Sequence, residues 1–219
     1  MRKRTLKKEQ STIAFNQKNQ SVPLDYYEHA IRHFGVQKFW HMQRVKAIKK
    51  LFGAANKAAI LDIGCNSGTT TNFFTAYGTI VGLDILGKNV LYGRKHYPKI
   101  NFAIGDGQYL PFANNSFDVV ICLETLEHIF NPYLLVKEVH RVLKTNGIFI
   151  LEVQDDSKII WKLIWWTWQK TTGKIWRHSH FHKFNRKTLI KILSPFFQIK
   201  LYSCHLKLSI IIKGIKKSK

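Results

Sequence analysis

The sequence predicts an α/β domain built on a Rossmann-like, seven-stranded mixed sheet with helices on both faces. Its 219 residues are 45% hydrophobic and 22% charged, which describes one globular domain with a sizeable core. From residue 58 onward, short apolar runs alternate with helical segments, the pattern of a parallel sheet. Three of the apolar runs end in an acid beside a glycine or a tight turn. In such sheets ligands bind outside the carboxyl ends of the strands, so these acids mark the expected site.

The N-terminal part is expected to be an arm followed by a helical cover. Residues 1–22 are basic and polar, which predicts a loose arm, and the absence of an apolar stretch there argues against a signal peptide. The remaining residues, 23–219, form the single predicted domain. Residues 23–52 read as two helices separated near Gly35. They either cover a sheet edge or form a lid, with Tyr26, Trp40, His41 or Arg44 facing a ligand.

The predicted strands and helices follow in order along the chain. Five strands and their connecting helices are expected in a core spanning residues 58–154, and an insertion over residues 155–184 precedes the last elements. Asn131 and Pro132 are a cap residue and a first-turn proline, which predict a helix start. The strands are Ala59–Ile63, Thr79–Asp84, Ile100–Ile104, Phe117–Leu123, Ile148–Val153, Phe197–Tyr202 and Leu208–Ile212, the last antiparallel. The helices are Thr69–Tyr77 (ended by Gly78), Lys88–His96, Asn131–Leu143 and Asn185–Leu193.

The turn after the first strand is the strongest candidate for a ligand-binding loop. Asp62 ends the strand, and Gly64 and Gly68 bracket a tight turn before a helix. Glycine lets backbone approach a ligand closely, because it has no Cβ and tolerates positive φ. Asn66 stands where a further glycine might be expected, and asparagine tolerates left-handed φ best among the other residues.

Two further acids end the next two strands. Asp84 ends the second, where a carboxylate can accept hydrogen bonds from both hydroxyls of a ribose. Asp106 follows the third, within Gly105-Asp106-Gly107, and could accept from an adenine amino group. Acids at three successive strand ends are improbable by chance and favour a nucleoside-containing ligand.

These motifs resemble those of the class I S-adenosylmethionine-dependent methyltransferases, in particular the ubiquinone and menaquinone biosynthesis branch. The resemblance is strong over residues 58–154 and weak in the flanks, and Asn66 departs from the usual glycine. It implies that S-adenosylmethionine is the cofactor. The matching segments are 61–68, 82–84, 105–112, 116–120 leading to 126–128, and 143–147.

The resemblance also implies a role for each motif residue. Asp62, Gly64 and Gly68 would position the methionine part of the cofactor, with Cys65 and Asn66 in the same loop. The predicted ribose contact is Asp84, followed by Ile85, and the adenine contacts are Asp106 and Gly107. Leu123, at the end of the fourth strand, would lie near the sulfonium.

Glu124, Glu127 and His128 are the candidate catalytic and metal-ligating residues. The spacing Glu-x-x-Glu-His can place Glu124 and either Glu127 or His128 on one side of a helical turn. In the quinone-precursor O-methyltransferases that the motif resembles, a matching pattern supports a divalent cation. Alternatively, His128 and Glu124 act without metal, or Glu127 pairs with a basic neighbour while His128 packs.

The insertion is basic and rich in tryptophan. Five of the six tryptophans lie between residues 158 and 176, and no acid follows Asp156. On a helix, Trp161, Ile164, Trp165 and Trp168 form one apolar stripe edged by lysines. Three interpretations stay open: a membrane-interface helix or lid for a lipophilic substrate, a cap on the domain core, or a surface that stacks on RNA. His178, His180 and His182 alternate after it, and His180 or His182 could border the active site.

The net charge and the cysteine content indicate which partners and which cellular compartment to expect. The net charge of +22 favours anionic partners, such as nucleic acid or anionic lipid, unless it merely reflects a Lys-rich host proteome. Three scattered cysteines and no apolar run of membrane-spanning length predict a cytoplasmic protein, either free or peripheral at the inner membrane surface.

The sequence thus predicts methyl transfer from S-adenosylmethionine to a small, lipophilic acceptor, such as a quinone precursor or lipid-like molecule, at the membrane surface. Two other functions remain open. The first is an RNA methyltransferase that uses the basic aromatic surface. The second is a non-catalytic, cofactor-binding partner of another enzyme.

Overall fold

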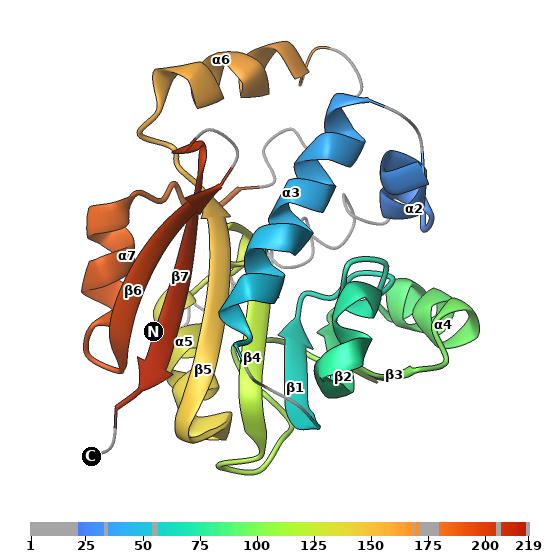
Figure 1. Cartoon of the computed structure of the whole chain (residues 1–219), viewed down its shortest axis with the longest axis vertical. Helices are drawn as coiled ribbons and strands as arrows, with labels where there is room; N and C mark the ends of the chain where they lie inside the picture. Colours follow the sequence, from blue (N-terminus) through green and yellow to red (C-terminus); the bar gives the residue numbers. More distant parts are fainter. Residues whose placement is uncertain are drawn as a thin grey trace, which may run out of the picture.

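A seven-stranded mixed sheet forms the centre of the molecule (Figure 1). The computed structural model describes residues 22–32, 35–53, 57–168, 170, 180–204 and 207–217. The predicted arm therefore lies outside the described residues, except for Val22. So do His178 and Trp176 of the insertion.

The strand order is β3-β2-β1-β4-β5-β7-β6. The strands are β1 (Ala58–Ile63), β2 (Gly78–Asp84), β3 (Ile100–Ile104), β4 (Phe117–Leu123), β5 (Leu143–Gln154), β6 (Phe197–Cys204) and β7 (Ser209–Lys216).

The pairing of the strands confirms the predicted mixed sheet. Strands β1 to β5 are mutually parallel where they pair. Strand β7 runs antiparallel to both of its neighbours, β5 and β6. The carboxyl ends of five parallel strands therefore lie along one edge of the sheet, where the predicted site residues meet.

Helices cover both faces of the sheet. They are α2 (Tyr26–Arg32), α3 (Val36–Leu51), α4 (Gly87–His96), α5 (Pro132–Val142), α6 (Ile159–Trp168) and α7 (Arg186–Leu193), with 3-10 helices η1 (Thr71–Tyr77) and η2 (Leu126–His128). One core cluster joins α3, η1 and α4 to sheet residues such as Ile60. The other joins α5 and α7 to residues such as Leu61. Successive strand residues point to opposite faces, so Ile60 and Leu61 serve the two cores.

The caps of α5 and α7 agree with the sequence. Asn131 accepts a hydrogen bond from the backbone N–H of Leu134, and proline follows at the first helical position. In α7, Asn185 and Thr188 cap each other reciprocally through side chain and backbone. Each bond satisfies a donor that a helix start would otherwise leave without a partner.

Several predicted boundaries were wrong, the clearest being the segment after the first turn. It forms the 3-10 helix η1 rather than an α-helix beginning at Thr69. Gly78 does not end it in a left-handed conformation but opens β2. A Cβ at Gly78 would lie 2.0 Å from the carbonyl oxygen of Ala58, so close strand pairing explains this glycine. Strand β5 begins earlier than predicted, because Leu143 already pairs with Phe117.

Helices α2 and α6 and the beginning of α3 lie beyond the carboxyl edge of the sheet (Figure 1). Helix α3 then descends across one face, and its residues Val45 and Ile48 are buried in the core. The N-terminal helices thus cover one face of the sheet and also lie over the carboxyl ends of its strands. Among the described residues, no helix has the length and apolar character needed to span a membrane.

Candidate active site

Two adjoining cavities lie at the carboxyl edge of the sheet. The first, here the strand-end cavity, has a volume of about 160 Å³ and is bordered by the ends of β1, β2, β3 and β4. The second, here the aromatic cavity, has a volume of about 180 Å³ and is bordered by α2, α3, η2, α6 and His180. Tyr27, Glu124 and His128 line both cavities and so mark the junction between them.

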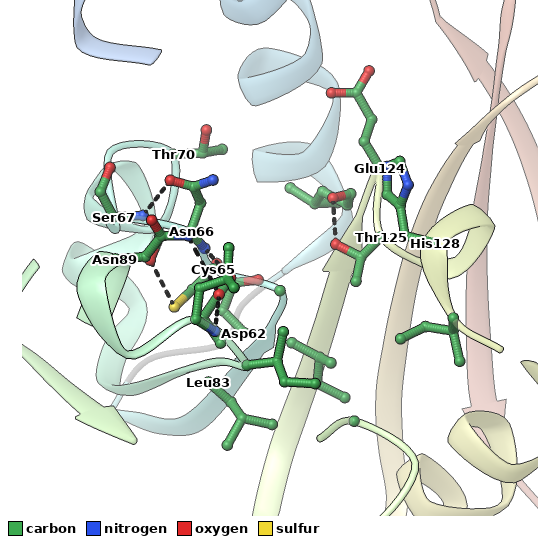
Figure 2. A pocket seen from close by; sticks show the side chains of 18 of the residues that line it. Asp62, Cys65, Asn66, Ser67, Thr70, Leu83, Asn89, Glu124, Thr125 and His128 are labelled. Carbon is green, nitrogen blue, oxygen red and sulfur yellow. Dashed lines mark hydrogen bonds between the residues drawn. The ribbon is translucent and has the colours of Figure 1, made fainter. Parts of the chain in front are cut away.

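The strand-end cavity gathers almost all of the predicted cofactor residues. Figure 2 shows the turn after β1 on one side of a pocket, with Glu124, Thr125 and His128 on the other. Gly68 does not line the cavity; a Cβ there would meet the ring of Phe102 at 2.6 Å, so this glycine shapes the turn. The predicted residues that line it are Asp62, Gly64, Cys65, Asn66, Asp84, Ile85, Asp106, Gly107 and Leu123.

The turn after β1 is fixed by backbone and by a buried acid. The N–H groups of Gly64 and Cys65 both donate to the carbonyl oxygen of Leu83, at 2.8 and 3.1 Å. Gly64 has φ +75°, and a Cβ there would lie 2.2 Å from Oγ1 of Thr125. Asp62 is 3% exposed and accepts a hydrogen bond of 2.6 Å from Thr71 Oγ1. Burial raises the pKa of Asp62 to about 7, and the charge of Asp84 adds to this while the Thr71 bond opposes it.

Asn66 connects the turn to the acid at the end of β2. Its φ is +52°, the left-handed conformation predicted for it, and its side-chain oxygen accepts from the N–H of Ser67 at 2.7 Å. Its own N–H donates to Asp84 Oδ2 at 2.9 Å. The other oxygen of Asp84 accepts from the N–H of Leu86 at 2.9 Å and from Asn89. Burial nevertheless raises the pKa of Asp84, while these bonds lower it.

Asp106 is paired with Gln108, a residue that the sequence did not single out. Oδ1 of Asp106 accepts from the backbone N–H of Gln108 at 2.8 Å, and its two oxygens accept from the Gln108 amide at 3.1 and 3.0 Å. The amide oxygen of Gln108 accepts from the N–H of Asn131 at 2.9 Å. The signal in the sequence is the glutamine two residues after Asp106, a spacing that lets its amide hydrogen-bond to that carboxylate. Further cavity residues not predicted are Ser67, Thr70, Asn89, Phe130 and Phe181.

At the end of β4, Glu124 joins the buried guanidinium of Arg44. The backbone of Glu124 is left-handed, with φ +48°. Glu124 forms an ion pair with Arg44 Nη1 and accepts a hydrogen bond from Gln154. Arg44 also lies 3.7 Å from Glu152 and 2.7 Å from His41 Nδ1. Burial raises the pKa of Glu152 to about 8, the charge of Glu124 adds to this rise, and that of Arg44 opposes it.

The N-terminal helices therefore contribute to the site, as the lid alternative proposed. Arg44 and Tyr27 line the strand-end cavity. Tyr26, Trp40 and His41 line the aromatic cavity instead. Helix α2 is linked to the neighbouring part of the molecule through Glu28, which accepts a 2.7 Å hydrogen bond from the hydroxyl of Tyr97.

Tryptophans of α3 and α6 form the walls of the aromatic cavity. The rings of Trp40 and Trp161 stack with centroids 5.7 Å apart, and Trp165 lies 5.6 Å from Trp161. His180 in turn lies 4.8 Å from Trp165. Burial, and next the nearby His128, lower the pKa of His180 to about 4, so its imidazole is neutral at pH 7.

The three candidate metal ligands do not converge. Glu124 faces Arg44, whereas the ring of His128 lies 4.9 Å from that of His180. Glu127 is 3% exposed, and burial, with the charges of Glu124, Glu152 and Asp156, raises its pKa well above the usual range. Within the described part of the chain, no three His, Cys, Asp or Glu residues are grouped as a metal site requires.

The segment around His180 and His182 borders the site, as predicted for these histidines. The backbone N–H groups of Phe181 and His182 donate to the carbonyl oxygen of Glu127, at 2.9 and 3.3 Å. The imidazole of His182 contacts the carbonyl oxygen of Phe130 at 3.1 Å. His180 lines the aromatic cavity, whereas His182 fastens the segment to the loop after η2.

The chain is similar to known methyltransferases over its sheet core. Residues 61–151 match the methyltransferase domain family. A ubiquinone biosynthesis O-methyltransferase of Rickettsia prowazekii is 29% identical over 135 residues, which are 59% of this chain and 51% of the relative. The human thiol S-methyltransferase TMT1B is also 29% identical, over 60% of this chain and 56% of the relative. The chain thus spans about half the length of these relatives.

The fold has close structural counterparts among methyltransferases. A crystal structure of an S-adenosylmethionine-dependent methyltransferase from Thermotoga maritima matches with a TM-score of 0.69 at 18% identity. The match covers 89% of this chain and 96% of that one. The predicted Rossmann-like fold is therefore confirmed over nearly the whole molecule.

Proposed function

We propose that the protein is an S-adenosylmethionine-dependent methyltransferase that methylates a small, lipophilic acceptor, because residues 61–151 match the methyltransferase domain family and the curated relatives are methyltransferases. The observation that carries the proposal is the junction of the two cavities. A polar cavity with acids at the strand ends adjoins an aromatic one, and Tyr27, Glu124 and His128 border both. A donor in the first cavity and an acceptor in the second would meet there.

The residues of the strand-end cavity fit S-adenosylmethionine by their chemistry. Asp84 Oδ2 accepts one described hydrogen bond, so it retains a lone pair for a ribose hydroxyl. A Cβ at Gly107 would lie 2.9 Å from Ile63, so the backbone after β3 packs closely beside the cavity. Bound S-adenosylmethionine supplies a methyl group on a positively charged sulfur. The nine predicted cofactor residues that line the cavity, from Asp62 to Leu123, are proposed to hold and orient it, and Gly68 is proposed to shape the turn.

Catalysis requires mainly orientation and exclusion of water, because sulfonium is a good leaving group. Of the two candidate catalytic residues, Glu124 is held by Arg44 and Gln154, which suits it to stabilise positive charge at the junction. We propose His128 as the base for an acceptor that must lose a proton. A divalent cation at Glu124, Glu127 and His128 would have to compete with Arg44 for Glu124. We therefore expect methyl transfer to survive a chelator.

The exposed face of α6 supports contact with an anionic membrane surface. While Trp161 is buried against the cavity, Ile159, Ile160 and Leu163 are 80%, 65% and 60% exposed. Lys170 lies 3.4 Å above the ring of Trp166, itself half exposed. An exposed apolar helix face with a cationic side chain just after the helix favours the lipid interface. A lipophilic acceptor could then pass from the bilayer to the aromatic cavity along α6.

Methyl-labelled S-adenosylmethionine tests the proposed reaction directly. The protein is incubated with the labelled cofactor and an extract of its own host, which is then separated into lipid-soluble, RNA and small polar fractions. We expect label in the lipid-soluble fraction, unchanged by a chelator. Label in RNA alone would instead support the RNA methyltransferase. Cofactor binding without label in any fraction would identify a non-catalytic partner protein.

A further inference from the structure

A buried carboxyl oxygen without a hydrogen-bond partner lies at the wall of the aromatic cavity. The Glu127 side chain is 3% exposed, and its Oε2 has no partner among the described residues. Glu127 lines the aromatic cavity but not the strand-end cavity. The two carboxyl oxygens of Glu152 also lack a hydrogen-bond partner in the described part of the chain, but Glu152 lies 3.7 Å from the guanidinium of Arg44 and lines neither cavity. Buried carboxyl oxygens in native proteins nearly always have a donor, so Glu127, which lines a cavity, is the residue whose missing donor a ligand can supply.

The charges around this oxygen are mostly negative, in a protein whose net charge is +22. The carboxyl groups of Glu124, Glu152 and Asp156 all act against a negative charge on Glu127. The buried cation nearby, Arg44, forms ion pairs with Glu124 and Glu152. A positively charged ligand group beside Glu127 would relieve this repulsion, whereas a neutral hydroxyl would not.

The remaining walls suit an organic cation with an apolar body. Trp40, Trp161 and Trp165 present ring surfaces, and Tyr26 and Tyr27 lie edge to face with centroids 5.3 Å apart. Tryptophan faces attract cations through their quadrupole and also bury apolar surface. His180 adds no opposing charge, because its pKa of about 4 leaves it neutral at pH 7.

We propose that the aromatic cavity binds an amphiphilic amine, with its ammonium group on Glu127 and its apolar body between the tryptophans of α3 and α6. The inference rests on the proposed function, because it takes the ligand of this cavity to be the methyl acceptor. Glu127 does not border the strand-end cavity, so the ammonium group serves to anchor the ligand. The atom that accepts the methyl group is another part of the ligand, at the junction.

A matched pair of probes tests the inference. Binding of 2-phenylethylamine and of 2-phenylethanol is measured by titration calorimetry at pH 7, with S-adenosylhomocysteine saturating. We expect the amine to bind at least about tenfold more tightly than the alcohol, since charge-assisted hydrogen bonds are the stronger ones. Equal or tighter binding of the alcohol would overturn the inference. The comparison uses the unaltered protein, so it does not depend on the folding of a variant.

Two substitutions then locate the anchor. Glu127→Gln should abolish the preference for the amine while leaving the affinity for the alcohol within about threefold. Glu152→Gln is the control, because Glu152 is equally buried but lines neither cavity; it should retain the preference. Retention of the preference in Glu127→Gln would refute the assigned anchor. Separately, failure of S-adenosylhomocysteine to bind would count against the proposed function itself, whereas its binding without an amine preference would count only against this inference.

Discussion

At the scale of single residues, Asp84 has two tasks, and Asp84→Ala removes both. Its carboxylate accepts from the N–H groups of Asn66 and Leu86, so it braces the turn, and it is also the proposed ribose contact. Because charge-assisted hydrogen bonds contribute strongly, Asp84→Ala should weaken S-adenosylhomocysteine binding at least about tenfold in calorimetry. Asp106→Ala should weaken S-adenosylhomocysteine binding to the same extent, but it leaves the hydrogen bonds of the turn after β1 in place.

Asp118→Asn provides a control for these two variants. Asp118 lies at the start of β4, where it pairs with Lys144 at 2.8 Å, far along the strand from the cavity. The Asp118→Asn variant should bind S-adenosylhomocysteine with the same affinity as the unaltered protein. An unchanged titration for Asp84→Ala and Asp106→Ala as well would show that these acids do not contact the ligand.

The raised pKa of Asp62 predicts how stability depends on pH. Burial raises this pKa from 3.8 in the unfolded chain to about 7, so between these values the folded state holds more protons. Stability attributable to Asp62 is therefore fully present below pH 3.8 and falls as the pH rises toward 7. The slope is at most about 1.4 kcal/mol per pH unit for one group. Asp62→Asn keeps an acceptor for Thr71 and removes the titration.

Urea unfolding of both proteins, at several values between pH 4 and pH 8, measures this difference. The stability of the unaltered protein relative to Asp62→Asn should decline across pH 4–7 and then level off. A constant difference over this range would mean that Asp62 keeps an ordinary pKa. Other buried acids, such as Glu127 and Glu152, cancel in the comparison because both proteins contain them.

At the scale of elements, helix α6 has one apolar face packed on α3 and another that is exposed. Trp161 packs on Trp40 of α3, whereas Leu163 is 60% exposed. If the outer face contacts anionic lipid, Leu163→Glu should reduce binding to phosphatidylglycerol vesicles at least about fivefold, because it places a charge at the apolar interface. Sedimentation with vesicles measures the bound fraction.

Leu91→Glu is the matched control for the vesicle experiment. Leu91 is 63% exposed on α4, which packs against β3 and β2, so the same chemical change is made on another helix. We expect it to bind vesicles like the unaltered protein. An equal loss of vesicle binding in both variants would indicate that net charge alone drives adsorption. Unchanged vesicle binding in both would exclude α6 as the contact.

At the scale of the whole molecule, the sheet and the strand-end cavity could be predicted from local patterns. Each predicted strand exists, because apolar runs and turn residues act within a few positions. The acids at the ends of β1 and β2 and just after β3 converge because parallel strands end at one edge. The 3-10 form of η1 was missed, since hydrophobic periodicity does not distinguish short helices.

The aromatic cavity could not be predicted in this way. Four separate segments supply Trp40, Glu127, Trp161 and His180, namely α3, η2, α6 and the segment before α7, and no spacing pattern relates them. The sequence also offered Arg44 only as one of several residues that might face a ligand. Its ion pairs with Glu124 and Glu152 depend on how α3 packs over the ends of β4 and β5. Such contacts are set by tertiary packing.

The stacked tryptophans also have a practical consequence, because they give the protein its own optical reporter. Trp40, Trp161 and Trp165 are half of the six tryptophans, and all three line the aromatic cavity. Indole emission responds to the polarity and the quenching groups beside the ring. Entry of a molecule into this space should therefore alter the intrinsic fluorescence, so that occupancy can be followed in real time without a dye or a label.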